Sequence, residues 1–322
     1  MITFFASHCS PFRQLLPFLG VLMLAGCGKA PVVNSGADDK PPVIVTTTTM
    51  ITDLVKQVGG DLFEIKPLMS AGVDPHLYKP TAEDVNKITK AKVVIYGGLH
   101  LEGRMVEIFE RLNPAEKITL SLGDSLPVDV RIPIAGLLYD PHIWGDAKLW
   151  AQTVPALVAT LVKASPTHKE EIELRGREAQ KSLMGLHSWL KMRSDLLAPE
   201  QRVLVTSHDA FQYFGRAYGF EVVGVQGIST DSEAGLKDIV RVIDLVRGRK
   251  VKAIFIESSV SPAVIQRIAK DSGVAIGGEL FSDALGIPGA MVDVGDEGKV
   301  DQGTLEGMLK SNMTTIINAL KP

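Results

Sequence analysis

Short apolar runs rich in β-branched residues alternate along this chain with amphipathic stretches of helical spacing. A run at 43–47, for example, is followed by a helical stretch at 51–58, and the pairing recurs further along. This alternation is typical of βαβ units, in which helices cover the faces of a parallel sheet. We expect strands at 43–47, 63–67, 93–96, 117–120, 203–206, 221–225, 253–257 and 274–276, and helices at 51–58, 81–89, 105–112, 211–218, 236–247, 262–270 and 308–320.

One long stretch interrupts this alternation. From Pro166 to about Leu197 there is no interior proline, and charged side chains are interleaved with apolar ones. We therefore expect one helix of about 30 residues, or roughly 45 Å at about 1.5 Å per residue. Gly176 and Gly185 each cost about 1 kcal/mol relative to alanine and allow a kink. A helix longer than the globular average is suited to connect two domains.

Chain length agrees with this division. At roughly 100–200 residues per domain, the 322 residues suggest two domains. The predicted fold class is α/β, with two lobes that each contain a parallel sheet and are joined by the long helix. We place the N-terminal lobe at 43–165, the connecting helix at 166–198 and the C-terminal lobe at 199–322.

The N-terminal segment has the features of an export signal. Arg13 precedes an apolar run, 15–24, which is shorter than the roughly 20 residues that span a membrane. We expect a lipoprotein signal peptide at 1–26 and a flexible tether at 27–42. The end of the signal, Leu-Ala-Gly before Cys27, resembles a bacterial lipobox, whose cysteine is acylated. An ordinary signal peptide with an incidental cysteine is the alternative. The chain is thus expected to be exported and lipid-anchored at Cys27, on the periplasmic or extracellular side of the membrane.

Cysteine usage and charge exclude several kinds of site. Cys9 and Cys27 are the only cysteines, so cleavage before Cys27 leaves a chain without disulfides, zinc–thiolate sites or cysteine nucleophiles. A net charge of −3 provides no basic field for nucleic acid. Any metal ion must therefore be held by nitrogen and oxygen atoms.

The tripeptide Asp-Pro-His occurs twice, and it ends at His76 and at His142. A third histidine, His208, directly follows an expected strand, and the chain has only seven histidines. Neutral imidazole is the commonest metal ligand among side chains, and proline stiffens the loops that would present it. We interpret these histidines as metal ligands rather than as surface residues in ordinary Asp-Pro turns. Asp283, in a loop after the run at 274–276, is the candidate fourth ligand.

Three imidazoles and one carboxylate suit zinc or another first-row divalent ion. Asp74, Asp140 or Asp209, each close to one histidine in sequence, is expected to accept a hydrogen bond from the second imidazole nitrogen and so to set its tautomer. Glu257 ends another expected strand and could support the ligands from behind, but glutamates in that position are usually solvated.

Several motifs together resemble those of the zinc- and manganese-binding solute-binding proteins of bacterial ABC transporters. The resemblance extends from about Val43 to the end of the chain, and it includes the lipobox and the long helix. It implies two α/β lobes around a rigid connecting helix and delivery of a metal ion to an importer permease in the inner membrane. The four ligand positions of the family correspond to His76, His142, His208 and Asp283. The motifs are Asp74–Tyr78, Gly98–Glu102, Asp140–Trp144, Ser207–Phe214 and Ser282–Gly286.

Selectivity between Zn²⁺ and Mn²⁺ stays open. The family has His or Glu at the third position, and His208 favours zinc. Many zinc members also carry a long loop rich in His and acidic residues in the first lobe, and this chain has none between Leu112 and Ile134. We expect a monomer without enzymatic activity. The alternative is a secreted zinc-dependent hydrolase, which would need an open coordination position for water. An additional adhesin role would leave no mark on the sequence.

Overall fold

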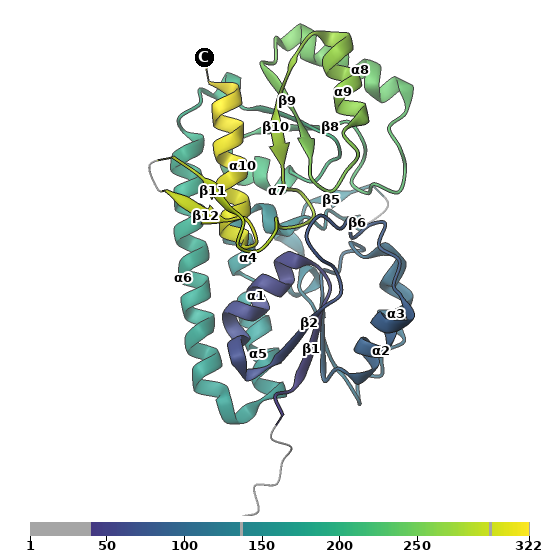
Figure 1. Cartoon of the computed structure of the whole chain (residues 1–322), viewed down its shortest axis with the longest axis vertical. Helices are drawn as coiled ribbons and strands as arrows, with labels where there is room; N and C mark the ends of the chain where they lie inside the picture. The colour runs from purple at the N-terminus through teal and green to yellow at the C-terminus, as the bar shows by residue number, and fades with distance from the viewer. Residues whose placement is uncertain (1–39, 136–137, 296–297, 322) are drawn as a thin grey trace, which may run out of the picture. The chain divides into compact units, whose positions relative to one another are not determined.

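The computed structural model describes residues 40–135, 138–295 and 298–321. The expected signal peptide, most of the expected tether and Cys27 lie outside the described residues. From Pro41 onward the chain forms one compact unit. Both halves of this unit are α/β structures with parallel sheets (Figure 1), which confirms the predicted fold class.

The N-terminal lobe is built on a four-stranded parallel sheet of order β2-β1-β3-β4. The central strands β1 and β3 are apolar along most of their length because side chains cover both of their faces. The strands are β1 (Val43–Thr46), β2 (Glu64–Pro67), β3 (Val93–Tyr96) and β4 (Ile118–Ser121). The helices are α1 (Thr49–Gly59), α2 (Ala82–Lys90), α3 (Val106–Glu110), α4 (Ala147–Ala151) and α5 (Val154–Ala164).

The C-terminal lobe has the same kind of strand arrangement. Strand β7 pairs in parallel with β8, β9 pairs in parallel with β10, and β7 lies beside β9. The sequence of neighbours β8-β7-β9-β10 therefore repeats the order of the first sheet. The strands are β7 (Val203–Thr206), β8 (Glu221–Gly224), β9 (Ala253–Glu257) and β10 (Ala275–Leu280). The helices are α7 (Gln212–Tyr218), α8 (Leu236–Arg249), α9 (Ala263–Ser272) and α10 (Leu305–Leu320).

The predicted long helix is present as α6 (Lys169–Ser194), which has 26 residues and follows a short 3-10 turn at Pro166–His168. It runs along both halves of the unit (Figure 1). It packs against α1, α4 and α5 of the N-terminal lobe and against α7 and α10 of the C-terminal lobe. The hydrophobic cluster that follows it contains residues from Ile44 to Leu320. The helix therefore joins the lobes through shared packing as well as through the backbone.

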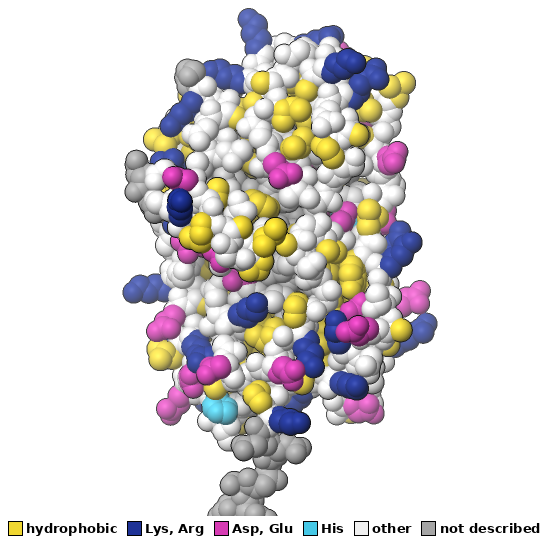
Figure 2. Space-filling model, viewed as in Figure 1, with side chains coloured by type: hydrophobic (Ala, Val, Ile, Leu, Met, Phe, Trp, Pro, Cys, Tyr) yellow, Lys and Arg dark blue, Asp and Glu magenta, His cyan; other side chains and the backbone are white. Residues whose placement is uncertain are grey.

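Some elements were not predicted. These are α4, α5 and two antiparallel pairs of short strands, β5 (Pro133–Ile134) with β6 (Leu138–Tyr139) and β11 (Met291–Asp293) with β12 (Lys299–Asp301). In the described parts of the chain, no helix combines the length and apolarity needed to cross a bilayer. Basic and acidic side chains are interspersed over most of the face shown in Figure 2, and basic ones gather along its upper margin.

Candidate metal centre

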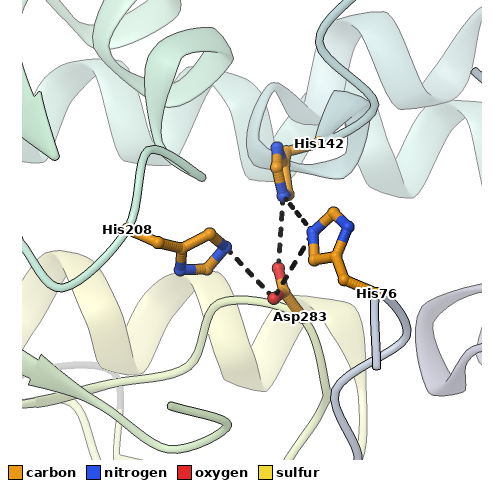
Figure 3. Close-up of side chains that lie close together, drawn as sticks. All are labelled: His76, His142, His208 and Asp283. Atoms are coloured by element: carbon orange, nitrogen blue, oxygen red, sulfur yellow. Dashed lines mark hydrogen bonds and ion pairs between the residues drawn. The ribbon is translucent and has the colours of Figure 1, made fainter. Parts of the chain in front are cut away.

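Four buried side chains from four separate loops point toward one another (Figure 3). His76 lies between β2 and α2, and His142 precedes a 3-10 turn at Ile143–Gly145. His208 follows β7, and Asp283 follows β10. In the C-terminal lobe the site thus lies at the carboxyl ends of parallel strands, where α/β sheets commonly bind ligands. Each of the four predicted residues offers one ligand atom, and these atoms all lie within 4.8 Å of one another.

The spacing of these atoms is that of ligands around one ion. Nε2 of His76 is 3.2 Å from Nε2 of His142, and Nε2 of His208 is 3.1 Å from Oδ2 of Asp283. The Nε2 atoms of His142 and His76 lie 3.5 and 4.0 Å from the Asp283 carboxylate. Four ligands placed tetrahedrally at zinc–nitrogen distances would be about 3.3 Å apart. The arrangement therefore fits a small cation with little adjustment.

Unpartnered polar atoms also indicate a cation. Among the residues that the structure describes, Nε2 of His208 and both carboxylate oxygens of Asp283 are buried without a hydrogen-bond partner. The 3.1 Å contact between Nε2 of His208 and Oδ2 of Asp283 lacks hydrogen-bond geometry. A buried carboxylate without a donor costs a few kcal/mol, roughly, unless another charge compensates it. A divalent ion bound between the four side chains would use Nε2 of His208 and one oxygen of Asp283 as ligands, and its charge would compensate the other oxygen.

Burial and mutual charge set the protonation of these groups. Burial lowers the pKa of His76 to about 4, so this imidazole is neutral near pH 7 and its lone pair is available. Burial by itself would raise the pKa of Asp283, but the neighbouring imidazoles of His208, His142 and His76 hold it well below its usual range. Burial opposes protonation of His208 as well, yet Glu257 and Asp283 raise the pKa of His208 well above its ordinary value.

Two of the three imidazoles are oriented by a carboxylate on their Nδ1 side. Asp140 Oδ1 lies 2.7 Å from Nδ1 of His142 and accepts the backbone N–H of the same residue at 2.9 Å. Glu257 Oε2 lies 2.6 Å from Nδ1 of His208, and Oε1 accepts the backbone N–H of that histidine at 2.9 Å. Each carboxylate therefore directs the Nε2 of its histidine toward the centre of the site.

The expectations for Asp74 and Asp209 need correction. Asp209 accepts from Gln212 Nε2 at 2.7 Å, and Glu257 occupies the position beside the His208 imidazole instead. Asp74 accepts the backbone N–H of His76, not its imidazole, and it also accepts the hydroxyl of Thr230. Asp140, two residues before His142, does reach the ring of its histidine, whereas the second carboxylate oxygen of Asp74, at the same spacing, bonds to Thr230 instead.

Trp144 contributes to the site by packing, which its place in the sequence indicates, and by a hydrogen bond, which the sequence does not indicate. Its ring lies edge-on to that of His142, with 5.3 Å between the centroids. Its indole N–H donates to the carbonyl oxygen of Ser282 at 2.8 Å, next to Asp283. One side chain of the N-terminal lobe thus packs on one candidate ligand and holds the loop of another. Only the Asp-Pro-His-Ile-Trp spacing places this tryptophan near the site in sequence.

Comparisons with known proteins agree with this geometry. The model of the protein family described as "Zinc-uptake complex component A periplasmic" matches residues 44–319. The manganese-binding lipoprotein MntA of Bacillus subtilis is 38% identical over 304 residues, covering 92% of this chain and 95% of the relative. The iron ABC transporter substrate-binding lipoprotein MtsA of Streptococcus pyogenes is 28% identical over 277 residues, covering 83% and 88%.

A solved structure is similar over most of the chain. The zinc-binding protein TroA of Treponema pallidum is 40% identical over 307 residues, covering 94% of this chain and 96% of the relative. Its structure, described as a periplasmic zinc-binding protein, superposes with a TM-score of 0.82 and covers 88% of this chain and 100% of that chain. The three relatives are named for three different metals, so similarity by itself does not select one ion.

Proposed function

This chain belongs to the family of the periplasmic component A of zinc-uptake complexes, and we propose that it captures one Zn²⁺ or Mn²⁺ ion outside the inner membrane and delivers it to an ABC-type importer. The observation that carries this proposal is the cluster of His76, His142, His208 and Asp283, with ligand atoms within 4.8 Å of one another. The ion is the cargo of the protein and is held through three Nε2 atoms and one carboxylate.

The same cluster argues against the alternative of a secreted zinc hydrolase. Catalytic zinc sites have three protein ligands and an open position for water, whereas four protein ligands complete a tetrahedral shell. The family is one of solute-binding proteins and not of enzymes. Three imidazoles favour zinc, but relatives named for zinc and for manganese are comparably similar to this chain. We therefore propose both ions as cargo.

We further propose that Cys27 carries the lipid that anchors the protein on the periplasmic or extracellular side of the membrane. The lipobox-like residues before Cys27 support this anchor, as do the relatives that are named lipoproteins. In this arrangement a monomer, with lobes at 43–165 and 199–322 and the connecting helix between them, presents its ion to a permease in the inner membrane. The segment at 27–42 would supply the tether between lipid and lobes.

Competition titration against chelating dyes tests the proposed cargo. We expect the chain to bind one Zn²⁺ or Mn²⁺ ion, and His142→Ala to weaken binding by more than about a hundredfold, because it removes a ligand rather than a residue that orients one. His100→Ala is the matched control, since His100 is exposed and lies outside the cluster. Circular dichroism should show the same folded structure in all three proteins.

The proposal would be contradicted by a wild-type chain that binds neither ion, or by equal affinities in wild type and His142→Ala. Separately, elemental analysis of protein purified from its native envelope would identify which ion it carries in the cell.

A further inference from the structure

One hydrogen bond between the lobes lies close to the metal centre and joins two residues that are not candidate ligands. Asp74 Oδ1 accepts the backbone N–H of His76 at 2.8 Å, and Asp74 Oδ2 accepts the hydroxyl of Thr230 at 2.6 Å. Thr230 belongs to the C-terminal lobe, in the segment between β8 and α8, and is 9% exposed. This bond therefore ties the loop of His76, in the N-terminal lobe, to the C-terminal lobe.

The base of the same segment is attached to the loop of another ligand. The backbone N–H of Gln226 donates to the carbonyl oxygen of Ser207 at 2.9 Å, and that of Asp209 donates to Gly227 at 3.2 Å. Ser207 and Asp209 flank His208. The segment from Val225 to Gly235 thus connects the surroundings of His208, at its base, to the surroundings of His76, near Thr230.

The three imidazoles differ in how they are held. Asp140 and Glu257 orient His142 and His208 through Nδ1, and each of these pairs lies within one lobe. Within the described part of the chain, no carboxylate bonds to Nδ1 of His76, so its direction depends on its backbone. That backbone is held by Asp74, and Asp74 is held by Thr230. Of the three imidazoles, that of His76 is therefore the one whose direction depends most on contact between the lobes.

We propose that Thr230 is a positioning residue that keeps His76 on the ion and thereby slows release of the ion, an inference that rests on the proposed function. An ion leaves a four-ligand site only after a ligand withdraws, and the His76 loop is the one without a carboxylate on its imidazole. Its withdrawal requires the hydrogen bond between Thr230 and Asp74 to break. Hydrogen bonds to a charged acceptor are among the strong ones, and this bond is partly buried.

Metal release measured by stopped-flow mixing with excess chelator tests this inference. Thr230→Val keeps the shape of the side chain and removes the donor, and we expect release to be about tenfold to a hundredfold faster. The association rate should stay within about twofold, because encounter with the ion does not require the bond. Thr230→Ser retains a hydroxyl and is expected to restore slow release.

Arg104→Gln is the matched control for contact between the lobes. Arg104 pairs with Asp231, next to Thr230, at 3.5 Å, and both side chains are about half exposed. Exposed ion pairs contribute little, so release from this variant should stay within about twofold of wild type. The metal-free form of each variant should unfold at the wild-type temperature. If Thr230→Val unfolds at a lower temperature than wild type, the rate of metal release is measured from Thr230→Ala instead.

Unchanged release in the folded variant that lacks the hydroxyl would overturn the inference, and so would equally fast release from Thr230→Val and Thr230→Ser. A wild-type chain that binds neither ion would overturn the proposed function, and this inference with it. Fast release confined to Thr230→Val, with normal ion capture, supports the positioning role.

Discussion

Buried carboxylates face two of the site imidazoles on the side away from the centre of the site. Asp140 is fully buried, Glu257 is 2% exposed, and each bonds to both the ring and the backbone N–H of its histidine. A carboxylate in this position fixes the tautomer, increases the basicity of the ligating nitrogen and adds negative charge near a cation. Affinity for the ion should therefore depend on residues that never touch it.

Glu257→Gln tests this dependence. The amide keeps the size of the side chain but removes its charge, and we expect metal affinity to fall about tenfold to a hundredfold without loss of the fold. Glu279→Gln is the control, because Glu279 lies on the neighbouring strand β10, opposite Ile256, and is exposed. Competition titration of both variants gives the comparison. Equal affinities for the two variants would show that Glu257 only fills space.

The sequence could predict the four candidate ligands more easily than the residues that orient them. Repeated Asp-Pro-His loops and the position of His208 after a strand are local features, and they led to the residues that the structure brings together. The partner of His208 is instead separated from it by 49 positions. Only the neighbouring positions of β7 and β9 bring Glu257 to that imidazole, so the nearer residue, Asp209, was the wrong choice.

At the scale of elements, prediction succeeded where the burial pattern is simple. Strands β3, β7 and β9 have the predicted bounds, because central parallel strands are short, apolar and bounded by polar residues or glycine. Helix α5 was missed because most of its residues are apolar, so its buried positions do not stand out as a helical stripe. These positions are Val154, Leu157, Leu161 and Ala164. The pair β11–β12 was missed because strands of three residues give too short a pattern.

Two glycines of α6 are predicted to respond oppositely to the same substitution. A Cβ at Gly176 would lie 2.4 Å from Cγ2 of Val158 on α5, whereas a Cβ at Gly185 would meet nothing within 4 Å. Gly185→Ala should raise the free energy of unfolding by about 0.5–1 kcal/mol through helix propensity. Gly176→Ala gains the same propensity but crowds a stiff β-branched side chain, at a cost of about 1–3 kcal/mol. We expect net destabilisation.

Urea unfolding of the two metal-free variants measures both effects on one helix. Stabilisation by both alanines would contradict close packing between α5 and α6, and it would remove the structural reason for a glycine at position 176. Destabilisation by both would contradict the open surroundings of Gly185.

At the scale of the whole molecule, the strands connect three hydrophobic clusters. Successive side chains of a strand point to opposite faces. Leu204 of β7 accordingly belongs to the core along α6, and the next residue, Val205, belongs to a second cluster beneath α8 and α9. Ile44 and Val45 of β1 divide in the same way between the core along α6 and a third cluster beneath α2 and α3. Loss of either outer cluster would therefore expose one face of a strand that the shared core needs.

We therefore predict that the two lobes unfold together. Trp144, Trp150 and Trp189 all lie in the shared core, so their fluorescence reports on it, whereas far-UV circular dichroism also includes α8 and α9. In denaturant, the metal-free protein should give coincident transitions by both methods.

Leu204→Ala in the shared core and Ile254→Ala in the second cluster remove fully buried side chains from neighbouring strands. Each substitution should lower the free energy of unfolding by about 2–5 kcal/mol while the protein still unfolds in a single transition. An early loss of dichroism in Ile254→Ala, with tryptophan fluorescence unchanged, would instead show that the cluster beneath α8 and α9 unfolds on its own.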